Sequence, residues 1–329
     1  MDSDGVFDGF MPAISDVTIS KPTASITSNG DLISVHCITI KAADKEYVFS
    51  IQPKDLQKLY FLILKTLMWV IFMSIKLYKN VDIGEVPPTP ATPFTAQNPT
   101  IRSIDSLIEY SIGLGYAVSY IQEQEGRLVQ NILPVYKTEY EQISTSSKVQ
   151  LALHTEAAFH PYKPDYVMLL CLRGDPTAVT TYANVKDIIS YLNEETIEYL
   201  QNEWYLTGVD KSFRTNGEPY SQFKLPVLTK AEDGYNMIYD EDLMEPMNLF
   251  AASALEKFSE AVSKSVKEIV LETGDLLIID NNKTIHGRKP FQPRYDGTDR
   301  WVQRMLVRKE LPPKNQVIGS TIITNFVKS

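Results

Sequence analysis

Residues 150–160 read Gln-Leu-Ala-Leu-His-Thr-Glu-Ala-Ala-Phe-His, and residues 274–286 read Gly-Asp-Leu-Leu-Ile-Ile-Asp-Asn-Asn-Lys-Thr-Ile-His. In a strand that runs through the first stretch, side chains at positions i and i+2 project from the same face, so His154 and Glu156 point together. The second stretch is a glycine turn followed by an apolar run, which is typical of a buried strand, and His286 comes just past its end. The sequence therefore predicts a β-rich fold in which strands present two imidazoles and one carboxylate.

Two imidazoles and one carboxylate are the ligands that a mononuclear non-heme iron(II) centre needs. Such ligands occupy one face of an octahedron and leave the other positions open for a co-substrate and dioxygen, unlike a closed structural zinc site. The chain has four histidines, at positions 36, 154, 160 and 286. The alternative is that His154 and His286 are buried histidines with ordinary hydrogen-bond partners. The spacing favours an oxygenase.

A second charged pattern follows the distal histidine. Residues 300–307 read Arg-Trp-Val-Gln-Arg-Met-Leu-Val, so Arg300 and Arg304 share one face of a strand and point into an apolar interior. Buried guanidinium groups need carboxylate partners, and bidentate bonds to a bound dicarboxylate or amino acid would supply them. The alternative is that both arginines pair with Asp or Glu residues of the protein.

Four motifs together resemble a known family: residues 153–166 (Leu-His-Thr-Glu-Ala-Ala-Phe-His-Pro-Tyr-Lys-Pro-Asp-Tyr), residues 171–173 (Cys-Leu-Arg), residues 285–288 (Ile-His-Gly-Arg) and residues 296–301 (Asp-Gly-Thr-Asp-Arg-Trp). They are similar to those of the clavaminate synthase-like iron(II)/2-oxoglutarate oxygenases, and most similar to the hydroxylases of free L-amino acids such as asparagine, arginine and lysine. The resemblance covers about residues 105–310.

The resemblance implies a double-stranded β-helix of the jelly-roll type, a mainly β core with added helices. It also implies that His154, Glu156 and His286 bind Fe(II), with 2-oxoglutarate and O2 as the other cofactors and succinate and CO2 as products. Relatives that halogenate have a small residue in place of the carboxylate ligand, so Glu156 favours hydroxylation. Desaturation and cyclisation stay open.

The resemblance also assigns roles in binding. Arg300 matches the arginine that binds the distal carboxylate of 2-oxoglutarate, and Arg304 matches one that contacts the substrate carboxylate. Thr180 is placed where the family has a hydroxyl donor for 2-oxoglutarate, although the adjacent Thr181 is the alternative.

Four further residues are expected to bind the substrate. Glu123 and Gln124 match a stretch that contacts its amino group. Asp240 and Asp242 match an acidic pair that binds a cationic far end, and in an extended segment both carboxylates would face the same way. We therefore expect hydroxylation at carbon 3 or 4 of a free basic L-amino acid, lysine before arginine. A neutral substrate such as asparagine and a non-catalytic, metal-binding jelly-roll module are the alternatives.

Composition excludes other classes. The chain has 329 residues, 43% of them hydrophobic and 22% charged, which is enough for a large core. A net charge of −9 argues against a nucleic-acid surface. Cys37 and Cys171 make neither a disulfide framework nor a thiolate metal site. No apolar signal follows Met1, so we expect a cytoplasmic protein whose partner is a small-molecule amino acid, with a homo-oligomer as an open alternative.

We expect two regions, residues 1–100 packed on a core at 101–329. The apolar stretch 59–75 is short for a bilayer span and contains a lysine, so a buried helix or subunit interface is expected rather than a membrane anchor. The acidic stretch 231–245 is a candidate lid or a solvated loop. The other expected elements are strands at 33–40, 46–51 and 127–135 and near 150, 166, 178, 275 and 302, a Pro-rich connector at 87–99, and helices at 103–113, 184–205 and 249–265.

Overall fold

The computed structural model describes residues 14–19, 23–26, 32–42, 45–51, 74–95, 101–214, 222–319 and 321–324. The chain divides into two compact units, Met1–Met73 and Ser74–Ser329. In the first unit, one antiparallel sheet has β3 at its centre, which confirms the strands expected at 33–40 and 46–51. Its strands are β1 (Ile14–Ile19), β2 (Thr23–Ile26), β3 (Leu32–Ala42) and β4 (Lys45–Ile51).

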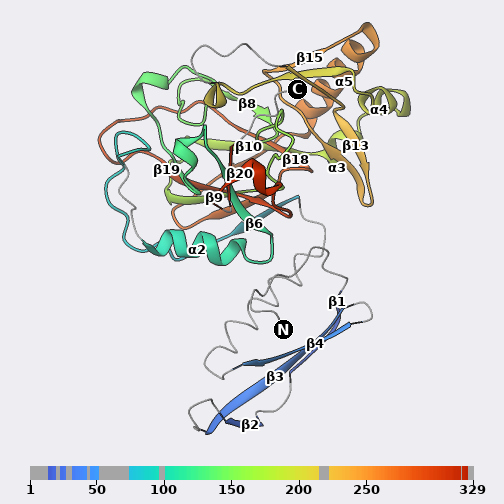
Figure 1. Ribbon diagram of the computed structural model, residues 1–329. Helices are drawn as coiled ribbons and strands as arrows, with labels where there is room; N and C mark the ends of the chain where they lie inside the picture. Colours follow the sequence, from blue (N-terminus) through green and yellow to red (C-terminus); the bar gives the residue numbers. More distant parts are fainter. Residues whose placement is uncertain are drawn as a thin grey trace. The chain divides into compact units, whose positions relative to one another are not determined.

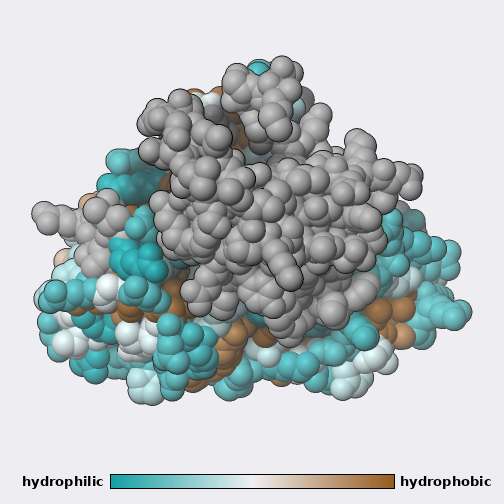
Figure 2. All heavy atoms as spheres, turned by 90° about the horizontal axis from the view of Figure 1, so that it is seen from below, coloured by the Kyte–Doolittle hydropathy of each residue, from teal (hydrophilic) through white to brown (hydrophobic). Residues whose placement is uncertain are grey.

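The helix expected at 59–75 lies almost entirely outside the described residues, and Ile75 is the first residue of a strand. Within the part of the chain that is described, no helix is both long and apolar enough to cross a bilayer. On the face drawn in Figure 2, hydrophilic residues dominate the coloured surface, and apolar areas are smaller and lie between them.

Two main sheets form the core of the second unit (Figure 1). Every strand pair in them is antiparallel except β21 with β6. The larger sheet has the order β20 (Val317–Ile318), β21 (Ile322–Ile323), β6 (Tyr116–Tyr120), β19 (Trp301–Arg308), β9 (Tyr166–Arg173), β17 (Leu276–Asp280) and β5 (Ile75–Tyr78), with β7 (Val129–Ile132) also paired to β19. The smaller has the order β16 (Lys267–Val270), β10 (Val179–Asn184), β18 (Thr284–Arg288) and β8 (Leu151–His154).

Helices and two small sheets complete the unit, and the mainly β fold with added helices is as expected. The helices are α2 (Ile101–Ser111), α3 (Val185–Ile189), α4 (Glu194–Leu200) and α5 (Leu249–Ser265). The small sheets are β12 (Gln222–Leu225), β11 (Tyr205–Gly208) and β15 (Met244–Pro246), and the hairpin β13 (Leu228–Ala231) and β14 (Gly234–Met237).

Helix α5 covers the outer face of the smaller sheet. It begins where the Asn248 side chain accepts a hydrogen bond from the backbone N–H of Ala251, which caps the first turn. Its buried residues recur at helical spacing and include Phe258. Phe258 belongs to one apolar core with Ala183 of β10 and Ile285 of β18. The opposite face of these two strands is thereby left for the site.

The Pro-rich connector contacts the core along its described part. The Thr89 hydroxyl donates to the carbonyl of Asp299 at 2.6 Å, and Arg173 donates to the Thr89 hydroxyl and to the carbonyl of Gly297. This holds the loop that precedes β19 in place.

Candidate active site and metal centre

The three predicted ligands meet on the smaller sheet. His154 and His286 are direct cross-strand partners of β8 and β18, with ring centroids 4.6 Å apart. One ligand atom each from His154, Glu156 and His286 lies within 4.8 Å of the others. Two local expectations were wrong. Strand β8 ends at His154, so Glu156 reaches the site from the turn that follows, and His286 lies inside β18 rather than just past a strand end.

The geometry suits an octahedral ion. His154 Nδ1 lies 2.8 Å from the carbonyl oxygen of Ala152, so this nitrogen donates and Nε2 stays available as a ligand. His286 Nε2 lies 3.7 Å from Glu156 Oε2. Metal bonds of about 2.1 Å place adjacent ligand atoms about 3 Å apart, close to this separation. Burial, with His154 nearby, lowers the pKa of His286 to about 3, which keeps the ring neutral as a ligand requires.

Asn281 connects the two metal motifs, and sequence reasoning missed it. It is fully buried, its Oδ1 accepts from the Glu156 N–H at 2.8 Å, and its Nδ2 donates to the carbonyls of Glu156 and Pro164 at 3.1 and 2.8 Å. The end of β17 thereby holds the backbone of the carboxylate ligand. The available signal was a polar side chain placed directly after a buried apolar strand.

Arg304 is engaged by protein side chains. It donates to Glu156 Oε1 at 2.7 Å, to Glu123 Oε2 at 2.8 Å and to Gln130 Oε1 at 2.9 Å. For Arg304 the structure therefore shows the alternative given above, in which the arginine pairs with carboxylates of the protein. Although burial opposes it, the Arg304 cation, with both ligand histidines, holds the pKa of Glu156 below its usual value. Arg304 therefore favours the ionised form of the Glu156 carboxylate and orients it.

Arg300 differs from Arg304 in having no such partner. It is 7% exposed and makes no hydrogen bond or ion pair with the residues that the structure describes. Burial lowers its pKa. Burial also lowers the pKa of Arg288 to about 9, and the Arg300 cation adds to the lowering. Two buried cations without carboxylates suit a bound dianion such as 2-oxoglutarate.

Register separates the two candidate threonines. Thr180 pairs with Arg288, two residues from His286, so it lies on the same face of the sheet as this ligand. Thr181 pairs with Gly287 on the opposite face, where its hydroxyl has no partner among the described residues. A Cβ on Gly287 would lie 2.5 Å from the carbonyl oxygen of Leu151, so close strand packing requires glycine here.

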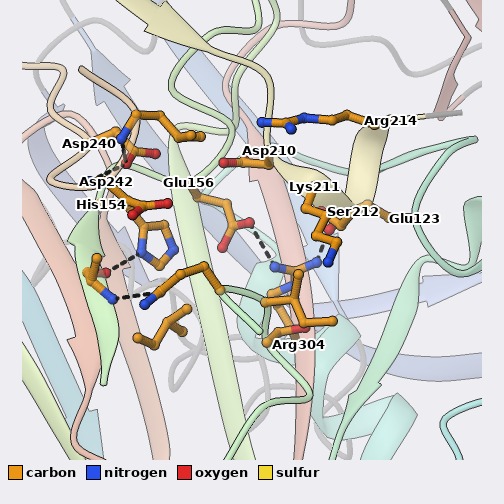
Figure 3. A pocket seen from close by; sticks show the side chains of 16 residues that line it. Glu123, His154, Glu156, Asp210, Lys211, Ser212, Arg214, Asp240, Asp242 and Arg304 are labelled. Carbon is orange, nitrogen blue, oxygen red and sulfur yellow. Dashed lines mark hydrogen bonds and ion pairs between the residues drawn. The ribbon is translucent and has the colours of Figure 1, made fainter. Parts of the chain in front are cut away.

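A cavity of about 200 Å³ opens beside the metal ligands. Glu123, Glu156 and Arg304 line one side and Asp240 and Asp242 the other (Figure 3). The prediction of an extended segment at 240–243 was wrong. Asp240 Oδ1 accepts hydrogen bonds from the N–H groups of Asp242 and Leu243 and closes a turn. Both aspartates still line the same cavity.

Sequence reasoning also missed Asp210, which points across the cavity toward Asp240 and Asp242 (Figure 3). Burial, then repulsion from Asp240, raises the pKa of Asp210 well above its usual value. Gln124 is not among the residues that line the cavity. Its side-chain amide donates to the carbonyl oxygen of Asn131 at 3.0 Å and accepts from the N–H of Asn131 at 3.1 Å.

The jelly-roll fold and the two-histidine, one-carboxylate site define the class of non-heme iron oxygenases that use 2-oxoglutarate. Residues 94–306 match the taurine catabolism dioxygenase TauD, TfdA family, and the chain belongs to this family, in its clavaminate synthase-like group.

The chain is 36% identical to the L-asparagine oxygenase of Streptomyces coelicolor over 70% of its length and 69% of that protein. It is 32% identical to the L-lysine 3-hydroxylase of Catenulispora acidiphila over 69% of its length, and the match spans 64% of that relative. A crystal structure of asparagine oxygenase with Fe(II), 3-hydroxyasparagine and succinate is 29% identical, with a TM-score of 0.71 over 84% of this chain and 86% of that one. The oxygenase OrfP, 29% identical with a TM-score of 0.70, has been solved with iron and α-ketoglutaric acid.

Proposed function

We propose that this protein hydroxylates carbon 3 or 4 of a free basic L-amino acid, lysine before arginine, in a reaction that depends on iron(II) and 2-oxoglutarate. The carrying observation is that three acidic side chains, Asp210, Asp240 and Asp242, line the cavity, and that Asp210 points toward the other two. A desolvated ammonium or guanidinium needs such compensation, whereas a neutral side chain does not.

The two ends of the cavity give the substrate a direction. Arg304 already donates to Glu123, Glu156 and Gln130, so it would offer its remaining N–H to the α-carboxylate. Glu123, whose pKa burial raises, would accept a further hydrogen bond from the α-ammonium. The side chain then extends past His154 toward the three aspartates, so carbons 3 and 4 pass beside the metal ligands. Holding both ends fixes which C–H bond faces the metal.

When bound, iron(II) with 2-oxoglutarate and O2 supplies the oxidant that inserts one oxygen atom into the C–H bond, while the co-substrate becomes succinate and CO2. His154, Glu156 and His286 would hold the metal, and Arg300 with Thr180 would hold the co-substrate. The protein's own contribution is to orient the substrate and to exclude water from the cavity. A candidate set of three ligands, and an Arg300 that has no ion-pair partner among the described residues, argue against a non-catalytic module.

We also propose a cytoplasmic enzyme, where iron(II) and 2-oxoglutarate are available, and residues 231–245 as the segment that closes over the substrate. This role is supported by Asp240 and Asp242, which belong to the segment and line the cavity. We further propose that residues 1–100 are an N-terminal addition to the core and that the chain forms a homo-oligomer.

The test is succinate formation with single amino acids, followed by Asp210→Asn, Asp240→Asn and Asp242→Asn on the best substrate. For lysine we expect kcat/KM to fall about tenfold or more per variant, because each removes one countercharge. Glu260→Gln, an exposed carboxylate on α5 outside the cavity, is the charge-matched control. Unchanged lysine turnover in all three aspartate variants contradicts a basic substrate.

Asparagine is the second candidate, because Arg214 lies along the rim of the cavity near Asp210 (Figure 3). A cation there offsets part of the negative charge and leaves room for a neutral amide. Preferred turnover of asparagine by the unmodified protein, with little effect of Asp210→Asn, would establish it.

A further inference from the structure

Arg288 follows the ligand His286 by two residues on β18, so the two side chains lie on the same face of the strand, about 7 Å apart along it. Thr180 of β10 is its cross-strand partner on that face. Arg288 is only 4% exposed. The face beside the metal site thus presents a buried cation next to the hydroxyl expected to bind the co-substrate.

The protein only partly satisfies this cation. Its Nη2 donates to Ser146 Oγ at 2.9 Å, its Nε donates to the carbonyl of Lys289 at 3.3 Å, and its Cζ lies 5.0 Å from the Phe291 ring centroid. Within the described chain no carboxylate pairs with it. Hydroxyl, carbonyl and ring contacts orient a guanidinium but do not neutralise it.

A second buried cation, Arg300, comes from just before β19 of the other sheet, close enough to Arg288 for mutual repulsion. Asp175 attracts Arg300 electrostatically but forms no ion pair with it among the described residues. Two like charges this deep repel each other, and a bound anion would offset that repulsion. A carboxylate placed between Thr180, Arg288 and Arg300 would relieve both.

We propose that Arg288 is a second cation for the distal carboxylate of 2-oxoglutarate, acting with Arg300, and that the pair selects a dicarboxylate co-substrate over a 2-oxo monocarboxylate. The inference rests on the proposed use of 2-oxoglutarate and deepens it. Because β18 also carries His286, one strand fixes a metal ligand and an anchor for the co-substrate at a set spacing.

The experiment uses the full chain loaded with iron(II) without oxygen, and follows the visible charge-transfer absorbance of the iron chelate. Two ligands are titrated: 2-oxoglutarate, and 2-oxovalerate, which has the same five carbons but no distal carboxylate. Arg288→Gln should raise the Kd for 2-oxoglutarate about tenfold or more and leave that for 2-oxovalerate nearly unchanged. Arg300→Gln is the positive control, and Lys289→Gln, an exposed neighbouring cation, is the negative control.

Equal weakening of both ligands by Arg288→Gln, or no change in either, overturns the proposal. Should that variant not fold, Arg288→Lys keeps the charge but loses the planar fork, and it must still weaken 2-oxoglutarate selectively. Unaltered selectivity in Arg288→Lys then overturns it. If the unmodified protein forms no chelate with 2-oxoglutarate, the proposed function itself fails, which is a different outcome.

Discussion

Asn281→Ala removes the link between the end of β17 and the backbone of the carboxylate ligand. Three hydrogen bonds are lost in a fully buried place, two to Glu156 and one to Pro164. At about 1 kcal/mol of net stability each, the loss is about 3 kcal/mol. For a unit of this size, each kcal/mol lowers Tm by about 2–4 °C, so we expect a drop of about 6–12 °C.

Stability alone does not show a positioning role, so iron(II) affinity is measured well below the lowered Tm. Loss of a group that orients a metal ligand typically weakens the metal by about 10- to 100-fold, and we expect a loss in this range. Asn282→Ala is the matched control, because the neighbouring Asn282 side chain forms its hydrogen bonds with Asp165 and Lys163 and not with Glu156. The reasoning is refuted if Asn281→Ala binds iron as tightly as the unmodified protein, or if both variants lose affinity equally.

Three further predictions concern the site. Alanine in place of His154, Glu156 or His286 should abolish succinate formation coupled to substrate while circular dichroism stays near that of the unmodified protein; near-normal activity removes that residue from the ligand set. Arg300→Ala should raise the apparent constant for 2-oxoglutarate about tenfold or more, or about 1.4 kcal/mol, in initial-rate assays, and weakening of the amino acid alone would reverse its assignment. Asp210→Asn should raise Tm at pH 7, because burial raises the pKa of Asp210 and the ionised carboxylate therefore destabilises the folded state. This cost of ionisation fades as pH falls toward 3.8, the pKa of an unperturbed aspartate, so the gain in Tm should shrink on acidification. A gain in Tm that grows on acidification contradicts this prediction.

Periodic patterns were reliable where the local sequence dictates the structure. Helix α5 spans Leu249–Ser265, as its periodicity predicts, and β19 spans Trp301–Arg308, where a strand is expected near 302. The His-x-Glu motif predicted two side chains that do come together with His286, but for partly the wrong reason. The turn after His154, rather than a continued strand, carries Glu156 there.

The sequence by itself determined the candidate cluster of two histidines and one carboxylate, the mainly β fold and the burial of Arg300 and Arg304, because residue type and spacing encode these locally. Only the tertiary structure brought in Asp210, Arg288 and Asn281, and gave Arg304 its partners Glu123 and Glu156. The physical reason is that these contacts join segments far apart in the chain. Their proximity depends on the register between strands and on which buried charges remain unpaired, and neither property is encoded in a local pattern.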